Sequence, residues 1–89
     1  MPVLFLKNNC VACKMTKKHL EAAGVLQYFE IRNIETENDP AIDERIDELK
    51  AEFGFKSAPI LDTADIGIEP FAGFVPKKIR LVASVLNAR

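Results

Sequence analysis

Residues 2–13 read PVLFLKNNCVAC and decide the fold. Residues 2–6 are an uninterrupted apolar run, which is typical of a strand buried on both faces of a sheet. Residues 7–9 are polar and end that run. Apolar and small residues then recur at helical spacing over 11–23, and Gly24 ends the pattern. Cys10 and Cys13 therefore stand where a predicted strand passes into a predicted helix.

These are the only two cysteines in the chain. They are too close in sequence for a disulfide between them to stabilise the fold much, because closing so small a loop restricts the unfolded chain very little. Cys10 falls at the predicted helix N-terminus, where unpaired N–H groups and the helix dipole stabilise a thiolate. Cys13 follows one turn later, within bonding reach. The arrangement predicts that Cys10 attacks a disulfide and that Cys13 resolves the mixed disulfide.

A metal site is the alternative use of such a pair. Zinc sites usually need four ligands, and the chain offers two thiols and His19. His19 lies six residues after Cys13, so we expect it on another, exposed face of the helix. An iron–sulfur cluster shared between two chains through Cys10, or a non-catalytic zinc-binding module, stays open as an alternative.

The remaining sequence predicts three more strands and two more helices. The strands are expected over 28–34, 59–61 and 66–68. A helix is expected to begin after Asp39, with Pro40 in its first position, and to end at Gly54, and a terminal helix is expected to follow Pro76. The order β-α-β-α-β-β-α predicts one α/β domain over residues 1–89. Its four-stranded mixed sheet is flanked by helices, with a parallel first pair of strands and a final hairpin.

Composition excludes several classes of function. The chain has 89 residues, of which 48% are hydrophobic and 28% charged, and its net charge is -1. This balance is that of a folded domain, and it lacks the basic excess of a dedicated nucleic-acid binder. No apolar run approaches the roughly 18 residues that span a bilayer, so no membrane partner is expected. Residues 2–6 are too short for a signal-peptide core, and we expect a cytoplasmic location.

Three segments together resemble a known family. They are the strand-loop-CxxC-helix start, the Ser57-Ala58-Pro59 segment before a strand, and Gly73-Phe74 before the last helix. Together they look like a glutaredoxin-like member of the thioredoxin superfamily, over nearly the whole chain. Within that superfamily the chain is most similar to the small redoxins that reduce class Ib ribonucleotide reductase. The matching residues are the Cys-Val-Ala-Cys motif, Thr16-Lys17, and residues 71–77 (FAGFVPK).

The resemblance implies a thioredoxin/glutaredoxin fold with Pro59 as a cis-proline that faces the cysteines. An incoming disulfide substrate would pair with the extended backbone at Ala58 as an added strand. The implied substrate-binding residues are Val11, Ala12, Ala58, Pro59, Gly73 and Phe74. The resemblance also implies a monomer with no bound cofactor, which receives electrons from a partner reductase or glutathione. Its partner is a protein disulfide, with ribonucleotide reductase as the candidate target.

The chain departs from the family pattern at several positions. Phe71 stands where these redoxins have tryptophan, and Lys77 stands where they have an acidic residue. The Gly-Gly segment and aspartate that hold glutathione in glutaredoxins are missing, which favours a thioredoxin-reductase-type donor. A glutathione-dependent glutaredoxin stays the alternative. Lys77 and Lys78 oppose the dipole of the last helix, so they are either tolerated surface charges or a rim for an acidic partner.

Overall fold

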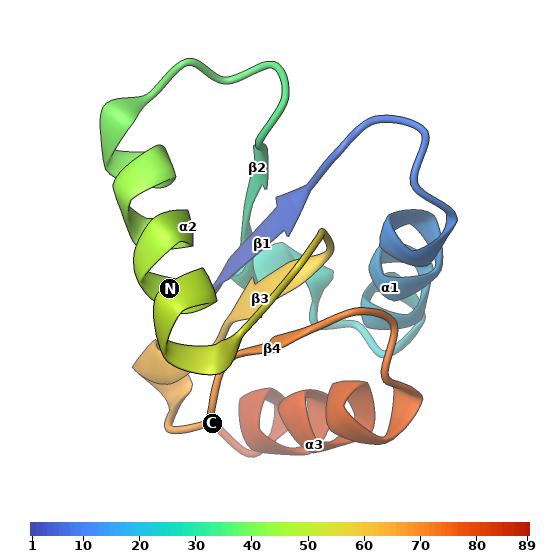
Figure 1. Cartoon of the computed structure of the whole chain (residues 1–89). Coiled ribbons are helices and arrows are strands. Elements are labelled where there is room, and N and C mark those ends of the chain that lie inside the picture. Colours follow the sequence, from blue (N-terminus) through green and yellow to red (C-terminus); the bar gives the residue numbers. More distant parts are fainter.

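The computed structural model describes all residues from 1 to 89 and confirms the predicted order of strands and helices (Figure 1). The strands are β1 (Val3–Leu6), β2 (Glu30–Asn33), β3 (Ile60–Asp62) and β4 (Phe71–Ala72). The helices are α1 (Val11–Ala22), α2 (Pro40–Phe53) and α3 (Pro76–Asn87), with short 3-10 turns at Leu26–Tyr28 and Ala64–Ile66. No helix is long and apolar enough to cross a membrane.

The strands form one mixed sheet in the order β2-β1-β3-β4. The first strand of the chain, β1, lies inside the sheet, parallel to β2 and antiparallel to β3. Helices pack against both faces of β1, which explains its continuous apolar run. A final antiparallel pair is also present, formed by β3 and β4. The predicted four-stranded mixed sheet is therefore confirmed.

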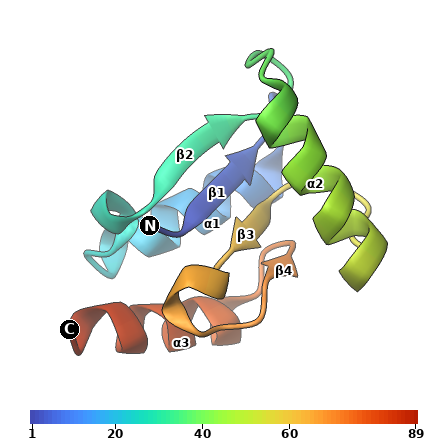
Figure 2. The same ribbon diagram turned by 90° about the vertical axis from the view of Figure 1, so that its left-hand side faces the viewer.

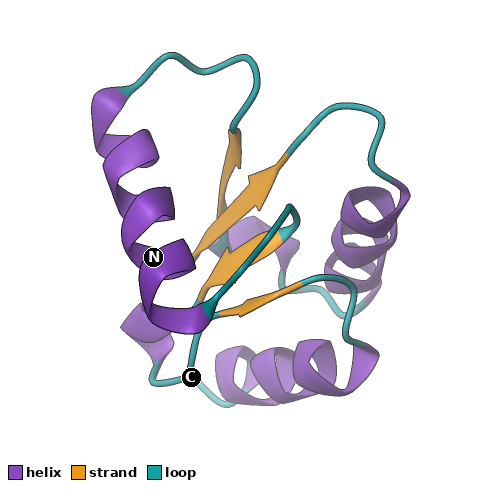
Figure 3. Cartoon of the chain, viewed as in Figure 1, coloured by secondary structure: helices purple, strands orange, loops and turns teal.

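The helices cover the sheet from two sides (Figures 2 and 3). On β1, Leu4 belongs to the core beneath α1 and α3, and its neighbour Phe5 belongs to the core beneath α2. Such alternation follows from the two-residue period of a strand. The larger core contains ten buried residues and the smaller contains five. The sheet thus separates a two-helix layer from a one-helix layer.

One predicted strand is wrong. Residues 66–68 form no strand, and the partner of β3 is the two-residue β4 instead. The chain forms a turn here instead of an extended strand. Gly67, which ends the 3-10 turn, adopts a φ of 76°, a conformation that favours glycine. The Thr63 hydroxyl donates to the carbonyl of Ile68 at 2.9 Å, which closes the loop. The predicted strand over 28–34 also begins late, at Glu30, because Leu26–Tyr28 forms a 3-10 turn.

The second helix is built as the sequence predicts. The Asp39 carboxylate accepts a hydrogen bond from the N–H of Ala41 at 2.9 Å, and Pro40 occupies the first helical position. Gly54 ends the helix with a φ of 72°. Its apolar stripe is buried against the sheet through Ile42, Ile46 and Leu49. Local capping rules are therefore sufficient to place this helix.

Candidate active site

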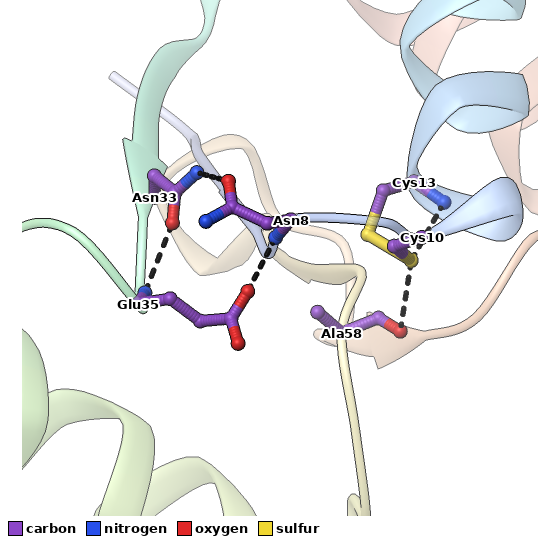
Figure 4. Close-up of a disulfide and its surroundings, with 6 residues drawn as sticks. All are labelled: Asn8, Cys10, Cys13, Asn33, Glu35 and Ala58. Carbon is purple, nitrogen blue, oxygen red and sulfur yellow. Dashed lines mark hydrogen bonds between the residues drawn. A yellow bond between two sulfur atoms is a disulfide. The ribbon is translucent and has the colours of Figure 1, made fainter.

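The cysteine pair lies where β1 passes into α1, on a loop braced by the neighbouring strand. The side chain of Asn33, at the end of β2, donates to the Asn8 side chain at 2.9 Å. The Asn8 N–H donates to Glu35, two residues after Asn33, so the end of β2 holds this loop through two hydrogen bonds (Figure 4). Asn9 follows with a φ of 51°, a left-handed conformation that asparagine tolerates. The loop thereby directs the chain into the helix at a fixed position.

Cys10 is the N-cap residue of α1, as the sequence predicts. The backbone N–H of Cys13 donates to the Cys10 sulfur at 3.1 Å, so the sulfur performs the capping that an oxygen usually performs. The two residues are joined by a disulfide, with their Cα atoms 5.2 Å apart. Both are buried, whereas Val11 between them is 73% exposed. A helix N-terminus with an N–H directed at sulfur stabilises that sulfur as a thiolate after reduction.

A second segment contacts Cys10 from the far end of the fold. The Ala58–Pro59 peptide bond is cis, as the resemblance implies. The Ala58 carbonyl oxygen lies 3.8 Å from the Cys10 sulfur, and Ala58 packs with both cysteines in one buried cluster. The N–H of Gly73 donates to the carbonyl of Pro59 at 2.8 Å. Cys10, Ala58, Pro59 and Gly73 are therefore brought together, although 48 residues separate the first two.

Phe74 lies one residue farther along and is half-buried. Its ring meets the ring of His19 edge-on, with 4.8 Å between centroids, so it joins the start of α3 to α1. His19 is exposed, as predicted.

No group of three or more histidine, cysteine or acidic side chains is placed to hold a metal ion. Phe71 is only 1% exposed and belongs to the core.

Sequence reasoning missed the residues that support the motif. Asn8, Asn33 and Glu35 carry no recognisable pattern, because their contacts join segments about 25 residues apart. Helical spacing places Thr16 on the same face of the first helix as Cys13 and Leu20. It is fully buried one turn after Cys13, and its hydroxyl has no hydrogen-bond partner in the protein. The helical spacing of the buried residues was the only signal that placed it on this face.

The charged groups with shifted pKa values lie away from the cysteines. The pKa of Glu37 is lowered because its carboxylate accepts hydrogen bonds from Arg32 and from the N–H of Asn33. The pKa of Asp65 is lowered by its hydrogen bond with the N-terminal ammonium. The guanidinium of Arg45 is held charged mainly by Asp62, which raises its pKa. None of the lysines on α1 or α3 forms an ion pair.

Comparison with known proteins gives one consistent result. The glutaredoxin family model matches residues 3–63. The chain is 30% identical over 83 residues to the glutaredoxin-like protein NrdH of Lactococcus lactis subsp. cremoris, a match that covers 93% of this chain and all of that protein. It is 33% identical over 76 residues to the glutaredoxin-like protein NrdH of Salmonella typhimurium, which covers 85% of this chain and 80% of that protein.

A solved structure agrees with the sequence relatives. The glutaredoxin-like protein NrdH-redoxin from Escherichia coli, described as having a thioredoxin-like activity profile, superposes with a TM-score of 0.69 at 27% identity. The match covers 91% of this chain and 92% of that structure, so the thioredoxin-type fold extends over nearly all of the chain. With the family match and the disulfide-bonded pair at the helix N-terminus, this chain belongs to the glutaredoxin family as a glutaredoxin-like, NrdH-type thiol-disulfide oxidoreductase.

Proposed function

We propose that the protein is a dithiol electron donor that reduces disulfides in partner proteins, with Cys10 as the nucleophile and Cys13 as the resolving thiol. One observation carries the assignment of roles. The Cys10 sulfur accepts the Cys13 N–H at 3.1 Å at the N-terminus of α1, whereas the Cys13 sulfur lies deeper in the helix. The position favours a thiolate on Cys10 and leaves Cys13 positioned to attack it.

The reaction has two exchange steps. The Cys10 thiolate attacks one sulfur of the target disulfide, forms a mixed disulfide and releases the other target sulfur as a thiolate. Cys13 then loses its proton and attacks the Cys10 sulfur, which forms the Cys10–Cys13 disulfide and releases the second target thiolate. Two electrons pass to the target. The proton lost by Cys13 protonates one target thiolate, and the other takes its proton from the solvent, which received the proton of Cys10 when its thiolate formed. The disulfide-bonded structure corresponds to the product of this sequence.

The residues around the pair are proposed to hold the target. Ala58 is buried beside Cys10, and its N–H makes no hydrogen bond within the protein. An extended target backbone would pair with this N–H and the Ala58 carbonyl, and Pro59 would exclude a competing donor. Val11 and Ala12, between the cysteines, would contact the target from α1. Gly73 and Phe74 would bound the site on the side of α3.

A thioredoxin-reductase-type enzyme is the proposed source of electrons. The residue after Gly73 is Phe74, and residues 75–78 read VPKK, so the second glycine and the aspartate that hold glutathione are replaced. Resemblance to the redoxins of class Ib ribonucleotide reductase supports that enzyme as the target. A protein that donates electrons to target disulfides must be kept in its dithiol form, which supports a reducing compartment, the cytoplasm. No bound cofactor is part of this proposal.

The deciding experiment compares two electron sources. Insulin reduction is measured with NADPH and thioredoxin reductase, and separately with NADPH, glutathione and glutathione reductase. We expect turnover with the first source and little with the second. Turnover with glutathione alone would replace the proposed donor and make the protein a glutathione-dependent glutaredoxin. If insulin is reduced with neither source, although circular dichroism shows that the protein is folded, the proposed function is contradicted. That result would favour the metal-binding alternative, which metal analysis of the purified protein would then test.

A further inference from the structure

The outer face of α1 bears two exposed large apolar side chains directly beside the cysteine pair. Val11 is 73% exposed and Met15 is 40% exposed. They lie four residues apart, so they are neighbours on one face of the helix. The other exposed large apolar residues are not on this helix; they are Met1, Tyr28, Ile31 and Leu81. An apolar stripe therefore begins inside the redox motif and continues for one turn away from it.

Unpaired positive charge flanks this stripe. Lys14 and Lys18 are also four residues apart, each follows a stripe residue by three, and both are exposed. Neither forms an ion pair. The first turn of α1 contains no acidic residue, and Glu21 is the only carboxylate on the helix. Lys14 and Lys18 lie in the fourth and eighth positions of the twelve-residue helix, so neither complements the dipole at a helix end, and neither has an ion-pair partner that would explain its position.

We propose that this outer face of α1, formed by Val11, Met15, Lys14 and Lys18, is the docking surface for the protein whose disulfide is reduced. The occupant is a target segment in which an apolar side chain next to the disulfide is accompanied by carboxylates. The apolar side chain covers Val11 and Met15, while the carboxylates face the two lysines. The inference rests on the proposed function, since it names the class of target that the same dithiol reduces. Met15 then becomes a target-binding residue outside the motif.

Charge across the molecule supports an acidic target. Helices α1 and α3 together carry six lysine and arginine residues and one carboxylate. Helix α2, on the opposite face of the sheet, carries five carboxylates and two basic residues. An acidic segment is therefore attracted to the layer that contains the cysteines and repelled by the other layer. Such complementarity orients an encounter before contact is made.

The test uses two synthetic peptides with one intramolecular disulfide each. They share a leucine beside the disulfide and differ only in that two glutamates of the first are glutamines in the second. Pre-reduced protein is mixed with each oxidised peptide at low salt, and the second-order rate of peptide reduction is measured in a single turnover. No reductase is needed, because the protein supplies both electrons. The ratio of the two rates cancels any change in the reactivity of Cys10.

We expect the wild-type protein to reduce the acidic peptide about 5-fold faster, and the preference to fade at high salt. The double variant K14Q/K18Q is expected to bring the ratio close to one. The matched control K50Q/R89Q removes the same charge from other parts of the surface and is expected to keep the wild-type ratio. M15Q is expected to slow both peptides by about 3-fold and to leave the ratio unchanged, because it removes apolar contact and no charge.

Two outcomes overturn the inference and one overturns the function beneath it. Equal rates for both peptides with the wild-type protein at low salt would show that this face does not select carboxylates. An equal loss of preference in K14Q/K18Q and K50Q/R89Q would show that net charge is responsible rather than this face. Failure to reduce either peptide would instead contradict the proposed disulfide reduction. A docking failure and a functional failure are thus separated in one experiment.

Discussion

The two helical layers use charge in opposite ways. On α2, Asp43 lies in the first turn and Lys50 in the last, which complements the helix dipole. Arg45 on the same helix pairs with Asp62 of β3 at 2.8 Å. On α3, by contrast, Lys77 and Lys78 occupy the first turn, no side chain caps the helix, and no carboxylate pairs with them. The charges of the α2 layer therefore contribute to stability, whereas Lys77 and Lys78 oppose the dipole of α3, and the one contact recorded for them is that of the Lys78 ammonium with the Phe71 ring, 5.4 Å from its centroid.

The largest expected effect is on disulfide reduction, and it comes from the cysteines in the layer formed by α1 and α3. Cys10→Ser removes the proposed nucleophile and is expected to reduce disulfide reduction to background. Cys13→Ser keeps the nucleophile and removes the resolving thiol, so we expect a mixed disulfide to accumulate, visible by mass spectrometry as a covalent adduct with the target. An adduct in Cys10→Ser and none in Cys13→Ser would reverse the assigned roles. Full activity in both variants would contradict the mechanism.

In the α2 layer the largest expected effect is on stability. Leu49 is fully buried in the smaller core, so Leu49→Ala is expected to lower the free energy of unfolding by about 3 kcal/mol. Urea unfolding followed by circular dichroism measures this change. Leu49→Met is the matched control, with an expected loss below about 1.5 kcal/mol. The rate of disulfide reduction per folded molecule is expected to stay unchanged in both, and a fall in that rate would contradict the separation of the layers.

A smaller effect is expected at the start of α3. Changing Lys77 and Lys78 to alanine is expected to raise the KM for the protein target about 2- to 5-fold at low salt. The same change removes two charges that oppose the helix dipole and also the contact of the Lys78 ammonium with the Phe71 ring, so these opposing effects are expected to leave stability nearly unchanged. An unchanged KM at low salt would identify the two lysines as tolerated surface charges. Lys50→Ala on α2 is the control, with an expected small loss of stability and no change in KM.

The smallest effect concerns pH and lies at the edge of the α2 layer. Because Arg32 and the Asn33 N–H lower the pKa of Glu37 in the folded protein, Glu37 contributes stability above about pH 4.3, its ordinary pKa. That contribution disappears as pH falls through the folded-state pKa. We expect Glu37→Gln to lower the urea midpoint slightly at pH 6, and we expect this difference from the wild-type protein to shrink as the pH is lowered below the ordinary glutamate pKa. A difference that stays constant as the pH is lowered would contradict this linkage.

Short-range rules predicted most of the fold. The N-cap at Cys10, the N-cap at Asp39 and the end of α2 at Gly54 all depend on residues within one turn of each other. The final strand was misplaced because β4 has two residues and exists only through pairing with β3. Its own sequence carries no two-residue period, whereas residues 66–68 alternate and imitate a strand. Nothing local distinguishes these two cases.

The candidate site likewise contains features that local sequence predicts and features that depend on long-range contacts. Helical spacing was enough to place both cysteines on one side of α1. The approach of Ala58 to Cys10 came only from the resemblance to a known family, since no periodicity relates residues 48 positions apart. The bracing of the loop by Asn33 and Glu35 could not be predicted either, because it depends on how closely β2 lies beside β1. Contacts of this kind become visible only in three dimensions.

The position of the first strand inside the sheet has a consequence for biosynthesis. The cysteines are synthesised first, and Ala58 and β3, which complete their surroundings, are made about 48 residues later. At a typical elongation rate of 5 to 20 residues per second, this delay is roughly 2 to 10 s. Throughout that interval both thiols belong to a nascent chain whose sheet is incomplete. The reactive centre is therefore chemically available before the fold that controls it exists.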